Sequence, residues 1–180
     1  IVFSLGKTNS IFAQSGDDIV VGLGKTNVVS GGDGNDVLLA GGKSNVFLGG
    51  AGDDLIVGLG KSNITFGDKG DDWILAAGSN NKFLDFYGNN TVVSLGSSNT
   101  VYTFKGKDVI FAGGKSNSVS TGDGNDVIVG IGQTNWLAGG NGSDIVIAGG
   151  VKNYVYEEGY FDQFTFSSIE LPGTDDFIPD

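Results

Sequence analysis

The most regular feature of the chain is a polar residue, Asp or Asn, at every ninth position from Asn9 to Asp162. Two residues after each of them stands an apolar residue, and Thr65 is the single polar exception. One inward apolar position per nine residues, flanked by β-branched and aromatic residues, is typical of a very short strand. The pattern therefore predicts an all-β solenoid with eighteen residues per coil, two short strands and two six-residue turns in each coil.

The ninth positions alternate between two series that differ in charge. The aspartate series consists of Asp18, Asp36, Asp54, Asp72, Asp108, Asp126, Asp144 and Asp162, with Asn90 in the remaining place. The asparagine series consists of Asn9, Asn27, Asn45, Asn63, Asn81, Asn99, Asn117, Asn135 and Asn153. No insertion or deletion interrupts the count, so each series should line one edge of the predicted solenoid. The two edges should therefore be chemically unlike.

Composition and charge narrow the chemistry. With 33 glycines and 2 prolines among 180 residues, the chain predicts many tight turns rather than collagen or a disordered linker. The net charge of -11 should repel nucleic acid and attract cations, of which calcium is the first candidate. Absence of cysteine removes disulfides, and a bound metal is another source of stability. Absence of histidine and cysteine also argues against an enzyme.

The turns that lead into the aspartates carry a motif. They read GGDGND at 31–36, GGAGDD at 49–54, GDKGDD at 67–72, TGDGND at 121–126 and GGNGSD at 139–144. Residues 31–39 and 49–57 match the nonapeptide G-G-x-G-x-D-x-U-x in full. This resembles the calcium-binding repeat of the RTX (repeats-in-toxin) family. The resemblance implies a right-handed parallel β-roll with Ca²⁺ ions held between successive turns.

Stacking explains why such turns would need a cation. Carboxylates about 5 Å apart repel by about 3 kcal/mol per pair at an effective dielectric of 20, and a cation between them reverses the sign. We therefore predict ions shared by consecutive members of the groups Asp18, Asp36, Asp54 and Asp72, and Asp108, Asp126 and Asp144. The resemblance implies that backbone carbonyls complete the shells, near Gly31, Asp33, Gly49, Ala51, Gly67, Lys69, Asp123 and Asn141. The alternative is a metal-free ladder in which the side chains hydrogen-bond their own loops.

Asn90 interrupts the aspartate series, and the adjoining turns read DFYGNN at 85–90 and TFKGKD at 103–108. Lys105 and Lys107 lie where other coils keep acidic residues, so calcium sites at this level are expected to be weak or empty. Two interpretations stay open. One is a decayed repeat, and the other is a hinge or contact patch built on the aromatic residues Phe86, Tyr87, Tyr102 and Phe104.

The other edge reads GLGKTN at 22–27, AGGKSN at 40–45 and GLGKSN at 58–63. Without an anionic ligand it should not bind calcium, and its asparagines can instead form a structural amide ladder. The ladder would contain Asn27, Asn45, Asn63, Asn81, Asn99, Asn117 and Asn135. The Gly-Lys-Ser/Thr triplets are not phosphate loops, because the required earlier glycine is replaced by Ile19, Val37 and Leu55.

A second resemblance concerns the combined spacing of the two edges. Residues 16–27, 34–45 and 52–63 each read Gly, seven residues, then G-x-x-N. This spacing is similar to the C-terminal repeats of multifunctional-autoprocessing RTX (MARTX) toxins, and it extends over residues 4–156. The resemblance implies a secreted bacterial toxin, export by type I secretion machinery, and folded repeats that help the toxin engage host cells. The rival class is a structural or adhesive region of a large RTX adhesin, including the ice-binding kind, although the apolar outer faces count against ice binding.

The residues on either side of each inward position should point outward. After the aspartate turns they are mostly apolar, as in the pairs Ile19 and Val21, Val37 and Leu39, Leu55 and Val57, Trp73 and Leu75, Val109 and Phe111, Val127 and Val129, and Ile145 and Ile147. Three explanations stay open: a partner protein covers this strip, a host membrane touches it, or the inside and outside positions are less distinct than the pattern suggests. We expect residues 1–156 to form the roll and residues 157–180 to form a cap with an acidic tail.

Overall fold

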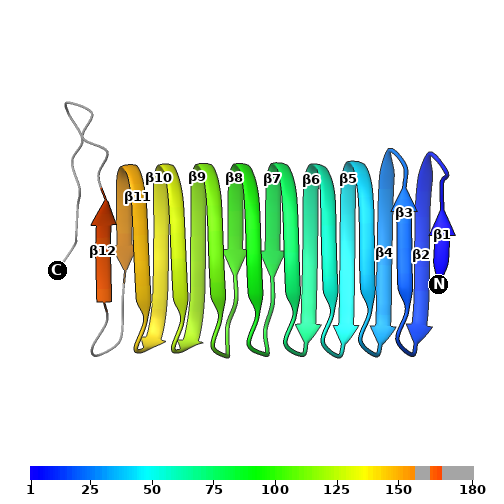
Figure 1. Cartoon of the computed structure of the whole chain (residues 1–180), viewed down its shortest axis with the longest axis horizontal. Helices are drawn as coiled ribbons and strands as arrows, with labels where there is room; N and C mark the ends of the chain where they lie inside the picture. The colour runs from blue at the N-terminus through cyan, green and yellow to red at the C-terminus, as the bar shows by residue number, and fades with distance from the viewer. Residues whose placement is uncertain (157–162, 168–180) are drawn as a thin grey trace.

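Every strand pairing in the structure joins residues eighteen positions apart. Val2 pairs with Val20, Val37 with Leu55 and Val127 with Ile145, and all pairings are parallel. The chain therefore winds into a parallel β-solenoid of about nine turns, as the sequence predicts (Figure 1). This is a computed structural model, and it describes residues 1–156 together with the backbone of 163–167.

The described residues contain twelve strands and no helix. The strands are β1 (Val2–Ser4), β2 (Thr8–Ser15), β3 (Ile19–Leu23), β4 (Thr26–Asp33), β5 (Val37–Ala51), β6 (Leu55–Lys69), β7 (Trp73–Leu84), β8 (Thr91–Tyr102), β9 (Val109–Gly124), β10 (Val127–Gly142), β11 (Ile145–Tyr156) and β12 (Gln163–Ser167). Within that part of the chain, no segment has the helical length and apolarity that a membrane crossing requires.

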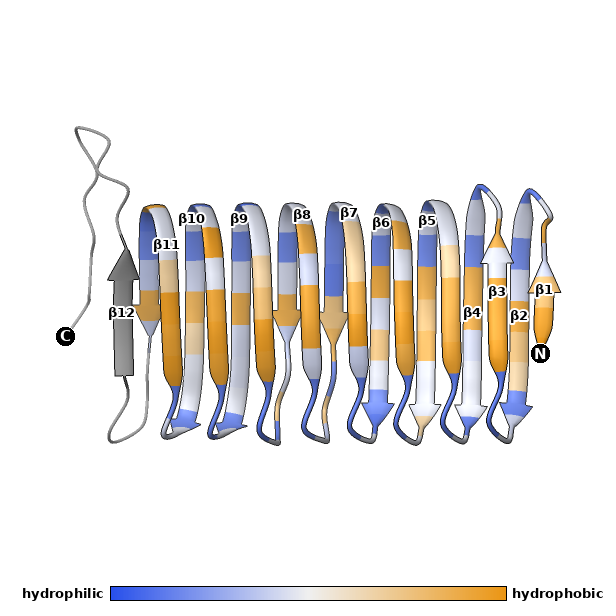
Figure 2. Cartoon of the chain, viewed as in Figure 1, coloured by the Kyte–Doolittle hydropathy of each residue, from blue (hydrophilic) through white to orange (hydrophobic). Residues whose placement is uncertain are grey.

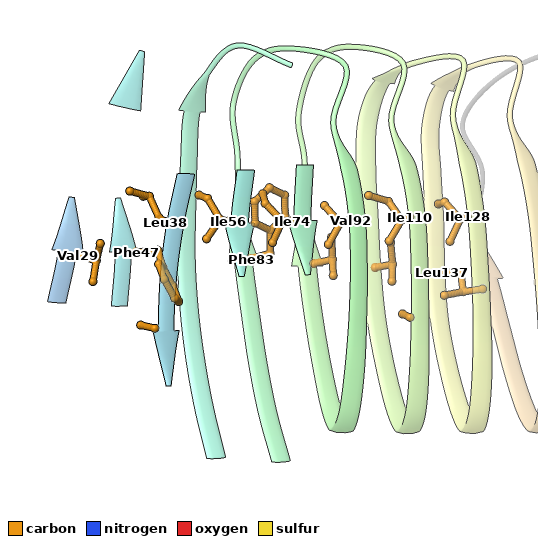
Figure 3. Packing of buried hydrophobic residues seen from close by; sticks show 14 of the residues in the cluster. Val29, Leu38, Phe47, Ile56, Ile74, Phe83, Val92, Ile110, Ile128 and Leu137 are labelled. Carbon is orange, nitrogen blue, oxygen red and sulfur yellow. The ribbon is translucent and has the colours of Figure 1, made fainter. Parts of the chain in front are cut away.

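The core is a double row of apolar side chains between the two walls of the solenoid. It consists of the inward positions that the nine-residue pattern predicts, including Val20 and the labelled residues Val29, Leu38, Phe47, Ile56, Ile74, Val92, Ile110, Ile128 and Leu137 (Figure 3). Each of these side chains is at most 1% exposed. The prediction of the inward positions is therefore confirmed, and Thr65 lies buried in the same row.

The two edges differ in backbone as well as in side chains. At the aspartate edge the strands stop, as between the end of β4 at Asp33 and the start of β5 at Val37. At the asparagine edge most strands continue, so β5, β6, β9 and β10 each contain 15 or 16 residues. These strands are longer than the sequence suggests, because the backbone bends there without leaving the register that pairs Ser44 with Ser62.

The outward positions form a narrower apolar surface than the sequence indicates. One row after the aspartate turns is exposed, and it contains Ile19, Val37, Leu55, Trp73, Val109 and Ile145. The second outward position is half-buried in Leu39, Val57 and Leu75 and buried in Val21. Apolar bands recur at similar heights in successive strands (Figure 2). The first outward position is therefore clearly exposed in these coils, whereas the second lies partly or fully inside.

The last described strand continues the winding of the roll. β12 pairs in parallel with β11 in the same register, so that Ile145 lies opposite Gln163. On the outer surface near this end, the ring of Trp136 stacks on Tyr154 and Tyr156, with ring centroids 4.0 and 6.2 Å apart. The cap and acidic tail expected over 157–180 lie outside the described residues, apart from the backbone of β12.

The burial difference between two leucines gives a test of the core. Leu38 is fully buried, whereas Leu59 is 49% exposed. We expect Leu38→Ala to lower the free energy of unfolding by about 2–5 kcal/mol, because it leaves a cavity in a core only two side chains thick. Leu59→Ala should change it by about 0.5 kcal/mol or less. Urea unfolding at saturating calcium measures both values, and equal effects would contradict the assignment of the interior.

Candidate metal sites along the aspartate edge

Six aspartates of the series lie buried in a single file along one edge. Asp36, Asp54, Asp72, Asp108, Asp126 and Asp144 are each at most 2% exposed, whereas Asp18, near the N-terminal end, is half-buried. Each stands directly before a strand of the wall. The file brings together six carboxylates that ordinarily carry a charge, in a place that water does not reach.

One oxygen of each side chain joins neighbouring coils. The backbone N–H of Asp36 donates to Oδ1 of Asp54 at 2.8 Å, and that of Asp54 donates to Oδ1 of Asp72 at 2.9 Å. The same bond links Asp18 to Asp36, Asp108 to Asp126, and Asp126 to Asp144, each at 2.8 Å. These bonds fix the direction of every carboxylate.

The second oxygen has no hydrogen-bond partner. This holds for Oδ2 of Asp36, Asp54, Asp72, Asp108 and Asp126. Burying an ionised oxygen without a donor is costly, so a proton or a cation has to accompany it.

Glycine provides the space in which such a cation would fit. A Cβ atom added to Gly31 would overlap Oδ2 of Asp36 and lie 2.9 Å from the carbonyl oxygen of Gly49. A Cβ on Gly49 would likewise overlap Oδ2 of Asp54 and lie 2.7 Å from the carbonyl oxygen of Gly67. The missing side chain thus leaves a cradle. We define a cradle as the space beside the first residue of a turn that begins with glycine. Its oxygens, one carboxylate and one carbonyl, are the donors that calcium prefers.

Comparison with known families agrees with this donor set. Residues 12–47, 30–64, 85–119, 102–130, 111–146 and 120–154 match the family model described as RTX calcium-binding nonapeptide repeat (4 copies), and together they cover more than half of the chain. The chain belongs to the RTX calcium-binding repeat family. It has no significant match among curated proteins or solved structures.

The RTX roll offers few side-chain ligands to any one ion. Within residues 1–156 no group of three or more His, Cys, Asp or Glu side chains surrounds a common point. Backbone carbonyls would therefore have to supply most of each coordination shell, as the sequence implies.

The carbonyls named from the sequence fall into different settings. Those of Gly49 and Gly67 face the cradles. The carbonyls of Asp33, Ala51, Lys69 and Asp123 accept N–H groups from glycines of the preceding coil at 2.7, 2.7, 2.9 and 3.0 Å, which leaves each a second lone pair. Gly31 lines the first of the cradles described above, and Asn141 pairs with Asp123 across the strands, where its side-chain amide donates to Oδ1 of Asp123 at 3.0 Å.

The first position of the turn is not glycine in every coil, and three buried residues there escaped the sequence analysis. Asp85, Thr103 and Thr121 occupy the place that Gly31, Gly49 and Gly67 hold elsewhere. The hydroxyl of Thr103 donates to the carbonyl oxygen of Thr121 at 3.2 Å, and that of Thr121 donates to the carbonyl oxygen of Gly139 at 2.8 Å. Aligning the turns at eighteen-residue intervals would have shown these substitutions.

The opposite edge is satisfied without a metal. From Asn9 to Asn135, each asparagine Nδ2 donates to Oδ1 of the asparagine in the next coil, as from Asn27 to Asn45 at 2.8 Å and from Asn45 to Asn63 at 2.9 Å, and only Asn153, at the end of the described ladder, has an Nδ2 without a partner. The ladder continues through Asn81, Asn99, Asn117 and Asn135 to Asn153 at distances of 2.7 to 3.0 Å. These side chains are neutral, so their burial creates no charge.

Burial changes the acidity of the carboxyl groups in the metal-free roll. Burial, together with the charges of Asp72 and Asp36, raises the pKa of Asp54 to about 7. Burial also raises the pKa of Asp72 to about 7, with the charge of Asp85 as the next contribution that raises it. The pKa values of Asp36, Asp108 and Asp126 are raised for the same first reason.

These shifts predict opposite pH dependences with and without calcium. Between the unfolded pKa of 3.8 and the folded pKa of about 7, the metal-free roll binds more protons than the unfolded chain, so its stability is lost as pH rises. In a chelator, the free energy of unfolding should be larger at pH 5 than at pH 8. In saturating calcium it should be larger at pH 8, because protons compete with the cation. The fraction folded, measured by circular dichroism, tests this in the chelator and urea unfolding tests it in calcium, and the same sign in both conditions would contradict it.

Proposed function

We propose that this RTX roll is a calcium-dependent folding module of a large secreted bacterial toxin. The observation that carries the proposal is the file of buried carboxylates, in which the Oδ2 atoms of Asp36, Asp54, Asp72, Asp108 and Asp126 have no partner. At neutral pH and without a cation these groups would either repel one another as charges or take up protons, and both outcomes disfavour folding. Calcium between the coils removes the conflict, so the folded state depends on the ion.

The location of calcium then decides where the chain folds. Extracellular calcium modules bind at roughly 10⁻⁴ to 10⁻³ M, far above the free calcium of a cytosol. A module in this range stays unfolded inside the producing cell and folds outside it. That behaviour suits export by type I secretion machinery, which we propose as a partner because an unfolded chain is the form that such export favours.

Engagement of a host cell is the second part of the proposal. The exposed row that contains Ile19, Leu55 and Trp73 runs along one outer face of the roll, and these side chains are 38 to 51% exposed. An apolar row of this kind suits contact with another protein or with a host-cell surface. Calcium would align the row, because its spacing is set by the coils that the ions hold together.

Circular dichroism tests the folding step directly. In a chelator at pH 7.5 the chain should lack most of its β signal, and titration with calcium should restore it cooperatively at submillimolar to millimolar concentration. A β signal that is the same with and without calcium would reject the proposal. Magnesium at equal concentration serves as a control, because its smaller octahedral shell fits carbonyl-rich sites poorly.

Two adjacent aspartates provide a matched pair of variants. Asp54 is buried in the file, whereas Asp53 is exposed and accepts the backbone N–H of Asp71 at 2.8 Å. Asn can replace either residue and keep the Oδ1 acceptor. Asp54→Asn should raise the calcium concentration at the folding midpoint by about tenfold, corresponding to about 1.4 kcal/mol, through loss of one charged ligand. Asp53→Asn should shift it less than twofold, and equal shifts would argue against the assigned file.

A further inference from the structure

A seventh buried carboxylate lies outside the ninth-residue series. Asp85 is fully buried and occupies the first position of the turn 85–90, where other coils have Gly31, Gly49 or Gly67. A buried aspartate at this position is unexpected, because the other coils have glycine or a neutral side chain there, and Asp85 is the one described residue that brings a charge to it. Its presence calls for a partner that the sequence motif does not supply.

Hydrogen bonds fix the orientation of Asp85. Its Oδ1 accepts the backbone N–H of Phe86 at 2.6 Å and that of Tyr87 at 3.2 Å. A parallel bridge between Lys69 and Tyr87 aligns this turn with the turn 67–72 of the preceding coil. With Oδ1 held by the turn, Oδ2 points in a defined direction and has no hydrogen-bond partner.

That direction leads into the cradle beside Gly67. A Cβ atom added to Gly67 would overlap Oδ2 of Asp85 and Oδ2 of Asp72, at equal distances from the two. Asp72 is 1% exposed, and its Oδ2 also has no donor unless a proton is shared with Asp85. Two buried oxygens from successive coils therefore converge on one small space, and neither can donate to the other while both are ionised.

Among the described residues, no positively charged group is paired with these two carboxylates. Within the described part of the chain, no lysine forms an ion pair with Asp72 or Asp85. Two carboxylates together carry the charge that one divalent cation neutralises. The chemistry of the pair thus matches a hard divalent ion.

The presence of Asp85 also bears on how Asn90 affects the file of carboxylates. Oδ1 of Asn90 accepts the N–H of Asp72 at 3.0 Å, and its own N–H donates to Oδ1 of Asp108 at 2.7 Å. The ladder of backbone bonds therefore passes through Asn90 unbroken. This coil lacks only the charge at the ninth position, and Asp85 supplies a charge five residues earlier in the same turn.

We propose that Asp72 and Asp85 hold a divalent cation between the turns 67–72 and 85–90, so that the file of ions continues past Asn90. This site rests on the proposed calcium-dependent folding, but it uses a ligand position that the nonapeptide motif reserves for glycine. It replaces the expectation of a weak or empty site at this level. Asn90 accepts the backbone N–H of Asp72, as the consensus aspartate would, and Asp85 provides the negative charge that the consensus aspartate would bring to the cation.

The test moves the carboxylate between the two positions. Asp85→Asn removes the charge with little change in shape, and Asp85→Gly restores the consensus cradle without a charge. The double variant Asp85→Gly/Asn90→Asp gives the turn GFYGND, which has the consensus glycine at its first position and the consensus aspartate at its last, and so returns the charge to the ninth position. Asp53→Asn is the control for loss of an exposed carboxylate. Calcium bound per chain is measured by equilibrium dialysis at saturating calcium, with folding followed by circular dichroism.

We expect both single variants at Asp85 to bind one calcium ion fewer than the wild type, and the double variant and Asp53→Asn to bind the wild-type number. If a single variant fails to fold in calcium, recovery of folding in the double variant supports the site equally. Wild-type stoichiometry in both single variants would overturn it, as would a folded double variant that still lacks one ion. A wild-type chain that binds no calcium would instead reject the proposed function, so the two failures are distinguishable.

Discussion

The structure depends on one electrostatic conflict, the stacking of buried carboxylates one coil apart. In five of them one oxygen accepts from the neighbouring backbone and the other has no donor, namely Asp36, Asp54, Asp72, Asp108 and Asp126. The first oxygen makes the stack geometrically regular, and the second makes it unstable when every carboxyl group is ionised. Because the core is a thin double row of side chains, burial of apolar surface has little excess with which to offset this repulsion.

The two edges of the roll represent two solutions to the same packing problem. Both need a polar side chain at every coil that reaches its neighbour. The asparagine edge uses an amide, which is donor and acceptor at once, so Asn45 and Asn63 complete each other without help. The aspartate edge uses a group that only accepts, so it is complete only with an additional positive partner. The asparagine edge is therefore satisfied from coil to coil up to the last amide of the ladder, Asn153, whereas the aspartate edge is satisfied only in a suitable environment.

The sequence predicted the parts of the structure that repeat and missed those that vary. The eighteen-residue count fixes the coil, the register and the inward positions such as Val20, Phe47 and Ile128, because each follows from periodicity alone. The long strands through the asparagine edge were not predicted, since a glycine-rich bend reads as a turn whether or not the backbone keeps its parallel bonds. Asp85 was missed because it does not stand at a ninth position, and only its burial and the cradle beside Gly67 reveal its role.

The irregular residues of the aspartate edge have a consequence for how the coils find one another. A solenoid of identical units could pair one unit out of step, and every backbone bond and every asparagine contact would still be made. Asp85, Asn90, Thr103 and Thr121 break that degeneracy, because a shift of one coil would set each of them beside the wrong neighbour. Variation along an otherwise uniform edge thus favours the correct pairing register of the coils over registers that are shifted by one coil.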